Sequence, residues 1–233
     1  MKNRSMTFRG VALCAALCAA SAAHANLLVN GSFESGGFVN QGSDTMSPAA
    51  GSTVITGWTV VTDTTAWIGA ANPFGLTASD GSFFLDLTNY QPGGPFAGVT
   101  QTIATTAGAT YTLSFDLGGS TFWGRPDALV ASAAGTSATF TTGAPSATTP
   151  NNDWYHETMQ FVATSVQTAI TLQGSAGNNY IGLDNVSVVL SADAPPPVAG
   201  VPEPHIWALM LAGLAAVGGA TRRGTRANAA ARR

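Results

Sequence analysis

Short runs of alternating apolar and polar residues dominate the chain between residues 26 and 190. In Thr110–Leu117, Leu113, Phe115 and Leu117 fall on one face of an extended chain, because successive side chains in a strand point to opposite sides. Glycine, proline, asparagine and aspartate separate these runs, as they do where strands end in turns. Many short strands with one apolar face each predict an all-β fold, in which two sheets enclose one core as a β-sandwich.

The alternation predicts eleven strands within a single domain that spans residues 26–190. In chain order they are Asn26–Glu34, Thr53–Val61, Thr65–Gly69, Ser82–Thr88, Val99–Thr105, Thr110–Leu117, Leu129–Ser132, Ser137–Thr141, His156–Ala163, Ala169–Gln173 and Ile181–Leu190. Loops are expected over residues 40–52, 89–97, 120–127 and 142–152, where turn-forming residues cluster.

The first 25 residues have the three parts of a secretory signal peptide. A positively charged start is followed by an apolar stretch over residues 11–22 and by the small-residue cleavage site Ala23-His24-Ala25. We therefore expect the mature chain to begin at Asn26, outside the cytoplasm. The alternative, a retained N-terminal membrane anchor, would require a longer apolar stretch.

The only two cysteines of the chain, Cys14 and Cys18, lie in this signal segment. A mature chain without thiols excludes a disulfide framework, a thiolate metal site and a cysteine nucleophile.

Charge is distributed unevenly along the chain. Residues 26–204 contain one basic residue, Arg125, and all twelve acidic residues, which gives this stretch a formal charge of −11. Such a surface repels phosphate backbones, so we expect no nucleic-acid partner. It does suit divalent cations.

The C-terminal residues 201–233 predict a membrane anchor. An apolar helix over residues 205–220 would be about 24 Å long at ~1.5 Å per residue, slightly less than the ~30 Å hydrocarbon core of a bilayer. The five arginines behind it should stay in the cytoplasm, which leaves the rest of the chain outside. Residues 191–200, with three consecutive prolines, predict a stiff spacer between the body and the membrane.

This tail resembles the PEP-CTERM sorting signal of Gram-negative bacteria that make exopolysaccharide. The motif residues are Val201, Pro202, Glu203 and Pro204. The apolar run Trp207–Leu214 and the arginines behind it complete the match. The resemblance implies that an exosortase-type membrane protease processes the chain. The body would first be anchored in the inner membrane, facing the periplasm, and would then reach the cell surface or the extracellular matrix.

A second resemblance covers the body. Its motifs, in order, include Asn26–Glu34, Ile55–Val60, Ser79–Leu87, Gly108–Leu117 and Leu183–Val188. Their order and spacing are similar to the bacterial choice-of-anchor C domain and, in turn, to plant cell-wall proteins of the galactose-binding-like jelly-roll type. The resemblance implies a jelly-roll β-sandwich. Because characterised relatives of that fold mostly bind glycans, it also implies a non-catalytic domain that binds extracellular polysaccharide.

In similar jelly-roll modules the first and last strands lie together and often share a structural calcium ion. Carried over to this chain, the resemblance assigns the metal to Glu34 and Asp184, with Asn30 or Asn185 as further oxygen donors. The alternative is that both carboxylates only cap strand ends or accept backbone hydrogen bonds.

Sugars bind proteins mainly by stacking on aromatic rings, while amides and carboxylates fix their hydroxyl groups. Trp58 and Trp154 fall inside strand motifs, so we expect them in the core. Trp123 and Arg125 share a loop and are the first candidates for ligand binding, and Tyr90 in the preceding long loop is the next. The alternative for Trp123 and Tyr90 is that both fold onto the edge of the sandwich.

Nothing in the sequence indicates an enzyme. His156 is the one histidine of the body, and no Gly-x-Ser-x-Gly turn accompanies it. Asp86 and Asp116 lie in strands, with no sign of the cleft that a glycosidase carboxylate pair would require. The sequence therefore favours a surface protein that binds polysaccharide. The alternative is a structural or adhesive surface protein without a specific sugar ligand.

Overall fold

The computed structural model describes residues 25–120, 122–123, 127–143 and 152–191. Its eleven strands are β1 Thr45–Met46, β2 Thr59–Val61, β3 Ala66–Gly69, β4 Phe83–Asp86, β5 Gly98–Ala104, β6 Thr110–Gly119, β7 Ala128–Ala133, β8 Thr136–Thr141, β9 Asp153–Val162, β10 Gln167–Ala176 and β11 Gly182–Leu190. The described residues contain no helix, so the predicted all-β class is confirmed.

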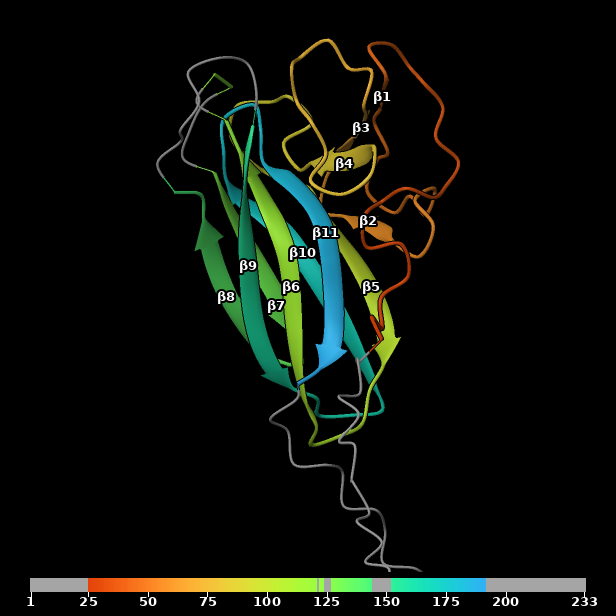
Figure 1. Ribbon diagram of the computed structural model, residues 1–233, viewed down its shortest axis with the longest axis vertical. Helices are drawn as coiled ribbons and strands as arrows, with labels where there is room; N and C mark the ends of the chain where they lie inside the picture. Colours follow the sequence, from red (N-terminus) through yellow and green to blue (C-terminus); the bar gives the residue numbers. More distant parts are fainter. Residues whose placement is uncertain (1–24, 121, 124–126, 144–151, 192–233) are drawn as a thin grey trace, which may run out of the picture.

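The strands form two antiparallel sheets that pack face to face as a jelly-roll sandwich (Figure 1). One sheet has six strands in the order β1-β3-β4-β11-β6-β9, and the other has five in the order β2-β5-β10-β7-β8. Long strands such as β6, β9 and β10 occupy the lower and middle part of the molecule, whereas the short strands β1 to β4 gather at its upper end (Figure 1).

The main core lies between the two sheets, and alternation predicted its residues correctly. Leu113, Phe115 and Leu117 of β6 are fully buried there. On the opposite face of β6, the hydroxyl of Ser114 is hydrogen-bonded to that of Ser187 at 2.7 Å. Trp58 is buried in this core, as predicted, whereas Trp154 is half-buried and lies on the outer face of the six-stranded sheet.

The opening segment corrects one prediction: Asn26–Glu34 is not a strand. Asn30 and Phe33 have φ values of 58° and 57°, which a strand cannot accommodate. The segment still runs beside β11, because the amide of Leu27 donates to the carbonyl of Val188 at 2.8 Å. The expected adjacency of the first and last segments is therefore confirmed, although only the last is a strand.

Two smaller corrections concern the same part of the chain. The expected loop over residues 40–52 contains the two-residue strand β1, which pairs with β3. The strand expected over Thr53–Val61 is limited to its last three residues, since Gly57 has a φ of 85° and interrupts the extended conformation.

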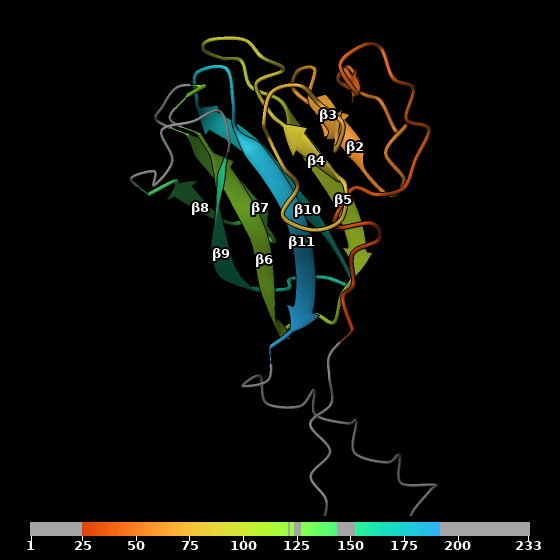
Figure 2. The same ribbon diagram turned by 45° about the horizontal axis from the view of Figure 1, so that its top comes forward.

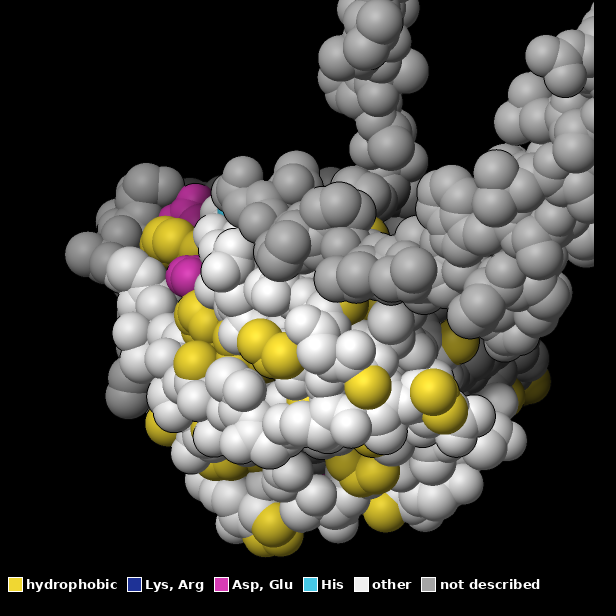
Figure 3. Space-filling model, turned by 90° about the horizontal axis from the view of Figure 1, so that it is seen from below, with side chains coloured by type: hydrophobic (Ala, Val, Ile, Leu, Met, Phe, Trp, Pro, Cys, Tyr) yellow, Lys and Arg dark blue, Asp and Glu magenta, His cyan; other side chains and the backbone are white. Residues whose placement is uncertain are grey.

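Both ends of the described chain lie at the lower end of the sandwich (Figure 1). Seen from below, the described surface there is mostly uncharged, with scattered apolar side chains and acidic side chains at one margin (Figure 3). Among the described residues we find no helix that could span a bilayer. Residues 1–24 of the predicted signal peptide lie outside the described residues. So do the Pro-rich spacer from residue 192 onward, the sorting motif and the apolar run over residues 205–220.

Candidate ligand-binding site

A second, smaller apolar cluster covers the outer face of the six-stranded sheet at its upper end. It is centred on residues of β3 and β4, because Ile68 and Phe84 are cross-strand neighbours that point away from the main core. Its buried members are Ala66, Ile68, Leu76, Phe84 and Tyr180. An outer sheet face would normally meet water, so loops must cover this one.

The side chain of Tyr180 reaches over the strands β6 and β11 where each carries a glycine. Gly118 and Gly182 face each other on these strands, and a Cβ at Gly118 would come within 2.7 Å of the Tyr180 hydroxyl. The two glycines thus leave the hollow in which the ring rests. The amide of Asn152 donates to the Tyr180 hydroxyl at 2.9 Å, and burial raises the pKa of this tyrosine well above its usual value.

Asp86 organises the floor of this region from a fully buried position at the end of β4. Its carboxylate accepts hydrogen bonds from the amides of Thr88 at 3.0 Å, Tyr90 at 3.2 Å and Ile181 at 2.9 Å. Burial raises its pKa to about 6, and these hydrogen bonds to the charged form partly offset that effect. One carboxylate therefore fixes the loop after β4 and the residue next to Tyr180 at the same time.

These two loops are also joined directly to each other. The amide of Asn179 donates to the carbonyl of Gln91 at 3.3 Å, and Pro92 forms an isolated bridge with Asn178. Figure 2, in which the upper end comes forward, shows both loops at this end of the sandwich.

The loops enclose a pocket of about 260 Å³ at the upper end. It is lined by Phe74, Leu76, Tyr90, Trp123, Asn179 and Tyr180. The centroid of the Phe74 ring lies 5.7 Å from that of Tyr90 and 5.9 Å from that of Trp123, and the rings of Phe74 and Trp123 are nearly perpendicular. The lining is thus four aromatic rings, one aliphatic side chain and one carboxamide.

Two polar atoms of the lining are buried without a hydrogen-bond partner among the described residues: the indole Nε1 of Trp123 and the hydroxyl of Tyr90. Burial raises the pKa of Tyr90 to about 12. The nearby hydroxyl of Thr45 lowers this pKa, which opposes the effect of burial. It does not form a hydrogen bond with the Tyr90 hydroxyl, because it donates to the carbonyl of Gly42 at 2.8 Å. Buried polar groups are normally hydrogen-bonded, so unpartnered ones in a pocket are suited to a ligand.

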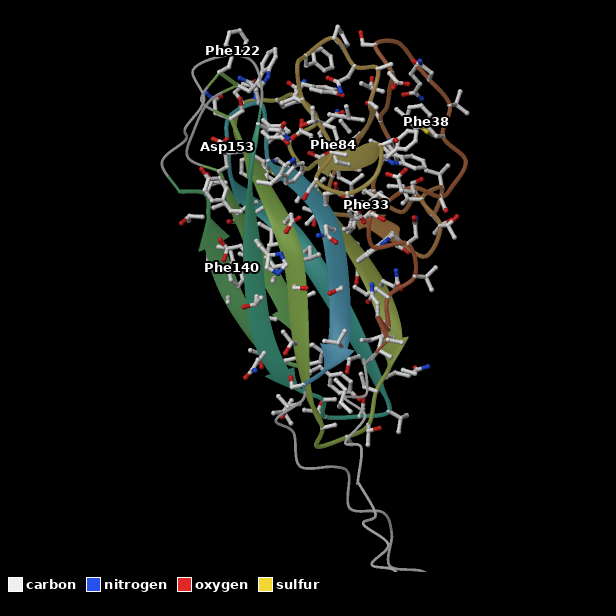
Figure 4. All side chains as sticks on the ribbon, viewed as in Figure 1. Phe33, Phe38, Phe84, Phe122, Phe140 and Asp153 are labelled. Carbon is white, nitrogen blue, oxygen red and sulfur yellow. The ribbon has the colours of Figure 1, made fainter. Side chains whose placement is uncertain are left out.

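Phe122 extends the aromatic surface beyond the pocket. Its side chain is 56% exposed and packs edge to face on Trp123 with ring centroids 4.8 Å apart. Figure 4 shows Phe122 at the upper margin of the molecule.

Two of the three predicted ligand-binding residues, Trp123 and Tyr90, therefore line the same pocket. The third, Arg125, lies outside the described residues. Sequence reasoning missed Phe74, Asn179 and Tyr180. The available signal was weak: Phe74 and Tyr180 are aromatic residues next to turn-forming asparagine, proline or glycine.

The predicted calcium ligands Glu34 and Asp184 both accept backbone hydrogen bonds. Glu34 binds the amides of Ser82 and Phe83, each at 2.7 Å, and Asp184 binds those of Ser79 at 2.8 Å and Asp80 at 2.9 Å. The two carboxylates thus hold the turn before β4 from either end. Burial raises the pKa of Asp184 to about 7.

The described residues contain no group of three or more histidine, cysteine or acidic side chains that could hold a metal ion. The two suggested additional oxygen donors also make hydrogen bonds within the chain. The side-chain amide of Asn30 donates to the carbonyls of Ser35 and Thr56, and its oxygen accepts from the amide of Ser35. The side-chain amide of Asn185 donates to Asp116 at 3.0 Å. Calcium at Glu34 and Asp184 stays a prediction.

His156 is hydrogen-bonded to Asp116, with 2.7 Å between Nδ1 and Oδ1. The hydroxyl of Ser79 donates to the other oxygen of the same carboxylate and not to the imidazole. A serine nucleophile needs a hydrogen bond to its general base, so this arrangement does not resemble a hydrolase triad. It secures the turn before β4 to the sheet.

The fold and the pocket define a jelly-roll β-sandwich with an aromatic site at the loop end opposite the chain ends. Residues 26–188 match the family described as "Protein of unknown function (DUF642)", and the chain belongs to this family. No curated protein sequence matches the chain.

Several solved structures are similar to this chain. One is TmCBM61 in complex with β-1,4-galactotriose, with 18% identity, a TM-score of 0.42 and coverage of 72% of this chain and 99% of that one. Family 16 Carbohydrate Binding Module-2 has 19% identity and a TM-score of 0.40, with 70% and 99% covered. The CBM22-1 xylan-binding domain of Paenibacillus barcinonensis Xyn10C has 16% identity and a TM-score of 0.41, with 73% and 97% covered.

Proposed function

We propose that this protein binds carbohydrate in the pocket formed by Phe74, Tyr90, Trp123, Asn179 and Tyr180. The observation that carries the proposal is the combination of several aromatic rings with a single carboxamide in a hollow at the loop end. Aromatic faces stack on the apolar faces of sugar rings, and a few well-placed polar groups fix the hydroxyls.

The size of the pocket supports a small ligand. Its volume of about 260 Å³ lies below the usual range for drug-sized ligands, so it suits one sugar residue rather than a chain segment. The indole N–H of Trp123 and the hydroxyl of Tyr90, which have no hydrogen-bond partner within the described part of the chain, would serve as polar partners. Phe122, on the rim, offers a surface for the next sugar of a chain.

The cellular setting completes the proposal. We propose that the protein is exported, held in the inner membrane of a Gram-negative bacterium by residues 205–220, and processed by an exosortase-type protease at the motif Val201–Pro204. The position of both described chain ends at the lower end supports this setting, because an anchored sandwich would direct its pocket away from the membrane (Figure 1). Its ligand would then be extracellular polysaccharide.

The proposal is tested by presenting the full chain, in mild detergent, to a glycan array and to the exopolysaccharide of the host. We expect Trp123→Ala to weaken binding at least tenfold, because an aromatic anchor of this kind contributes about 2 kcal/mol or more. Phe38→Ala is the matched control, since Phe38 is a half-buried loop aromatic that packs on Trp67 and Phe83, away from the pocket.

Retention of sugar by the wild type and by Phe38→Ala, but not by Trp123→Ala, would support the pocket. Equal retention by all three chains would place the sugar elsewhere. If no sugar is retained, the carbohydrate proposal is wrong, and a structural or adhesive surface protein becomes the better account.

A further inference from the structure

The four edge strands of the two sheets differ in how they are protected against pairing with another strand. An exposed edge presents unpaired backbone groups, and proteins usually shorten it, cover it or place charges on it. β1 has two residues and β2 has three. β2 is also covered, because the amide and carbonyl of Val60 bond to Ser52 and Gly51 at 2.9 and 2.8 Å.

β9 is protected by a charge. Glu157 lies opposite Phe115 in the strand register, so its side chain is on the face that carries the main core. Burial already raises the pKa of this carboxyl, partly offset by His156. A strand added beside β9 would bury the carboxylate further, which is unfavourable.

β8 has none of these features. It is six residues long and contains no charged residue and no proline, and it pairs with β7 on one side and with no other strand of the described chain. Its sequence from Thr136 to Thr141 is rich in threonine, which favours strands.

The turn before β8 determines which backbone groups are unpaired. Ala134 and Gly135 form a two-residue loop with φ values of 50° and 80°, as in a type I′ hairpin. The flanking pair, Ala133 and Thr136, is then hydrogen-bonded, and hydrogen-bonded pairs alternate from there. Ser137, Thr139 and Thr141 consequently point their amides and carbonyls away from β7. No hydrogen bond of these backbone groups to the rest of the described chain is present.

The main core is also open at this edge. Ala138 and Phe140 face the core from β8 but are only half-buried. The ring of Phe140 packs edge to face on Phe115, with centroids 5.2 Å apart. Figure 4 shows Phe140 beside β8 and β9 at the margin of the sandwich. A neighbouring strand would cover the exposed part of this ring.

We propose that two copies of the chain pair through antiparallel β8 strands, with Thr139 on the two-fold axis. This register is the one that uses all three outward-facing residues: Thr139 pairs with its own copy, and Ser137 pairs with Thr141 of the other chain in both directions. Each such pair exchanges two N–H···O bonds. The two five-stranded sheets become one continuous sheet of ten strands. Threonine side chains then meet across the junction, a favourable cross-strand combination.

The symmetry has a geometric consequence. Because the paired strands are antiparallel, the second copy is inverted, and its upper end points in the opposite direction. The two aromatic pockets lie at opposite ends of the dimer, and so do the two pairs of chain ends. Such a dimer joins copies held on facing surfaces rather than neighbours in one membrane.

Single cysteines test the register directly, because the only cysteines of the chain can be replaced as Cys14→Ser and Cys18→Ser. In the full chain, purified in mild detergent, Thr139→Cys places two thiols in a hydrogen-bonded pair with Cα atoms ~5.5 Å apart, within disulfide range. Ser137→Cys is the matched control, since its two copies would lie roughly 14 Å apart, four residues along the strands.

We expect mild oxidation to cross-link Thr139→Cys at least tenfold faster than Ser137→Cys. An equal mixture of Ser137→Cys with Thr141→Cys should also cross-link, to about half the extent of Thr139→Cys, because half of its dimers combine the two variants in register. Equal rates for the two single variants would indicate random collision, and a monomeric Thr139→Cys would show that β8 does not pair in this way. Either outcome overturns the proposal.

Thr139→Pro provides a second measurement. Proline removes the outward-facing amide and keeps every bond to β7, so the sandwich should fold and melt as the wild type does. Loss of the two central hydrogen bonds should weaken dimerisation by roughly tenfold or more in sedimentation equilibrium. Thr139→Ala retains the amide and should dimerise within about twofold of the wild type. An unchanged dimer in Thr139→Pro would contradict the pairing.

Discussion

The main core and the outer aromatic cluster are built from the same six-stranded sheet, but they arise in different ways. The main core is formed by alternate residues of long strands, and its side chains, such as Leu113 and Phe115, pack against the second sheet. The outer cluster rests on the opposite side of the shorter strands and is covered by loops that supply Phe74, Tyr90 and Trp123. The first arrangement stabilises the sandwich. The second leaves a hollow that is suited to binding.

The two regions also differ in whether they contain buried acidic side chains. The buried side chains of β5 and β10 that face the main core are hydrophobic or, like Gln101 and Thr168, uncharged, whereas Asp86 and Asp184 are fully buried on the sheet that carries the outer cluster. Their carboxylates hold turns and loops in place at the cost of desolvation. We therefore expect changes in the main core to act on stability, and changes in the outer cluster to act on ligand binding and on the response to pH.

The largest effect is expected from Phe115→Ala. Phe115 is fully buried in the main core, and replacing such a ring by alanine leaves a cavity that costs about 3–5 kcal/mol of unfolding free energy. Chemical denaturation followed by tryptophan fluorescence measures this loss. A cost as small as that of Thr158→Ala, an exposed change on β9, would mean that the space between the sheets is not the principal core.

Acidification should stabilise the protein through the outer region. Burial raises the folded-state pKa of Asp86 to about 6 and that of Asp184 to about 7, both from 3.8. Between about pH 4 and 7 the folded chain therefore binds more protons than the unfolded chain, so the unfolding free energy falls as pH rises through this window. From pH 8 to pH 5 we expect a gain on the order of 4 kcal/mol from the two carboxyls together, measured by urea denaturation at each pH.

Asp184→Asn removes one of these titrating groups and should flatten the dependence on pH. If the variant and the wild type gained equally on acidification, the stabilisation would not come from this carboxyl. A wild type that lost stability between pH 8 and pH 5 would show that other groups dominate.

A smaller effect is expected from Gly182→Ala, which fills the hollow beneath Tyr180. The added methyl group would collide with the tyrosine hydroxyl and would lie 2.8 Å from the Cα of Gly118. We expect a loss of about 1–2 kcal/mol, together with weaker sugar binding and an altered near-ultraviolet circular dichroism spectrum. Normal sugar binding by this variant would show that the position of Tyr180 does not matter to the pocket.

The sequence predicted the two regions with unequal success for a physical reason. Alternation in a strand is a local property, so the core-facing residues of β6 could be assigned without any knowledge of neighbouring strands. The strand over Asn26–Glu34 failed because its apolar residues look extended, whereas positive φ values at Asn30 and Phe33 turn the chain. Its position beside β11 is fixed by hydrogen bonds to residues about 160 positions away.

The pocket could be predicted only residue by residue. Trp123 and Tyr90 were recognisable as aromatic residues in loops. That they line one pocket depends on how separate loops fold over the sheet. Tyr180 reaches the site only because glycines stand at positions 118 and 182, a pairing across two strands that no local pattern reveals.

The arrangement of the chain ends has a practical consequence. Because the chain enters beside β11 and leaves from β11 at the same end, a short peptide could join the two ends to give a circularly permuted domain, with new termini opened in a surface turn such as that at Gly135. The same geometry would allow the sandwich to be inserted into a loop of an unrelated host protein, or repeated in tandem, with each pocket still turned outward.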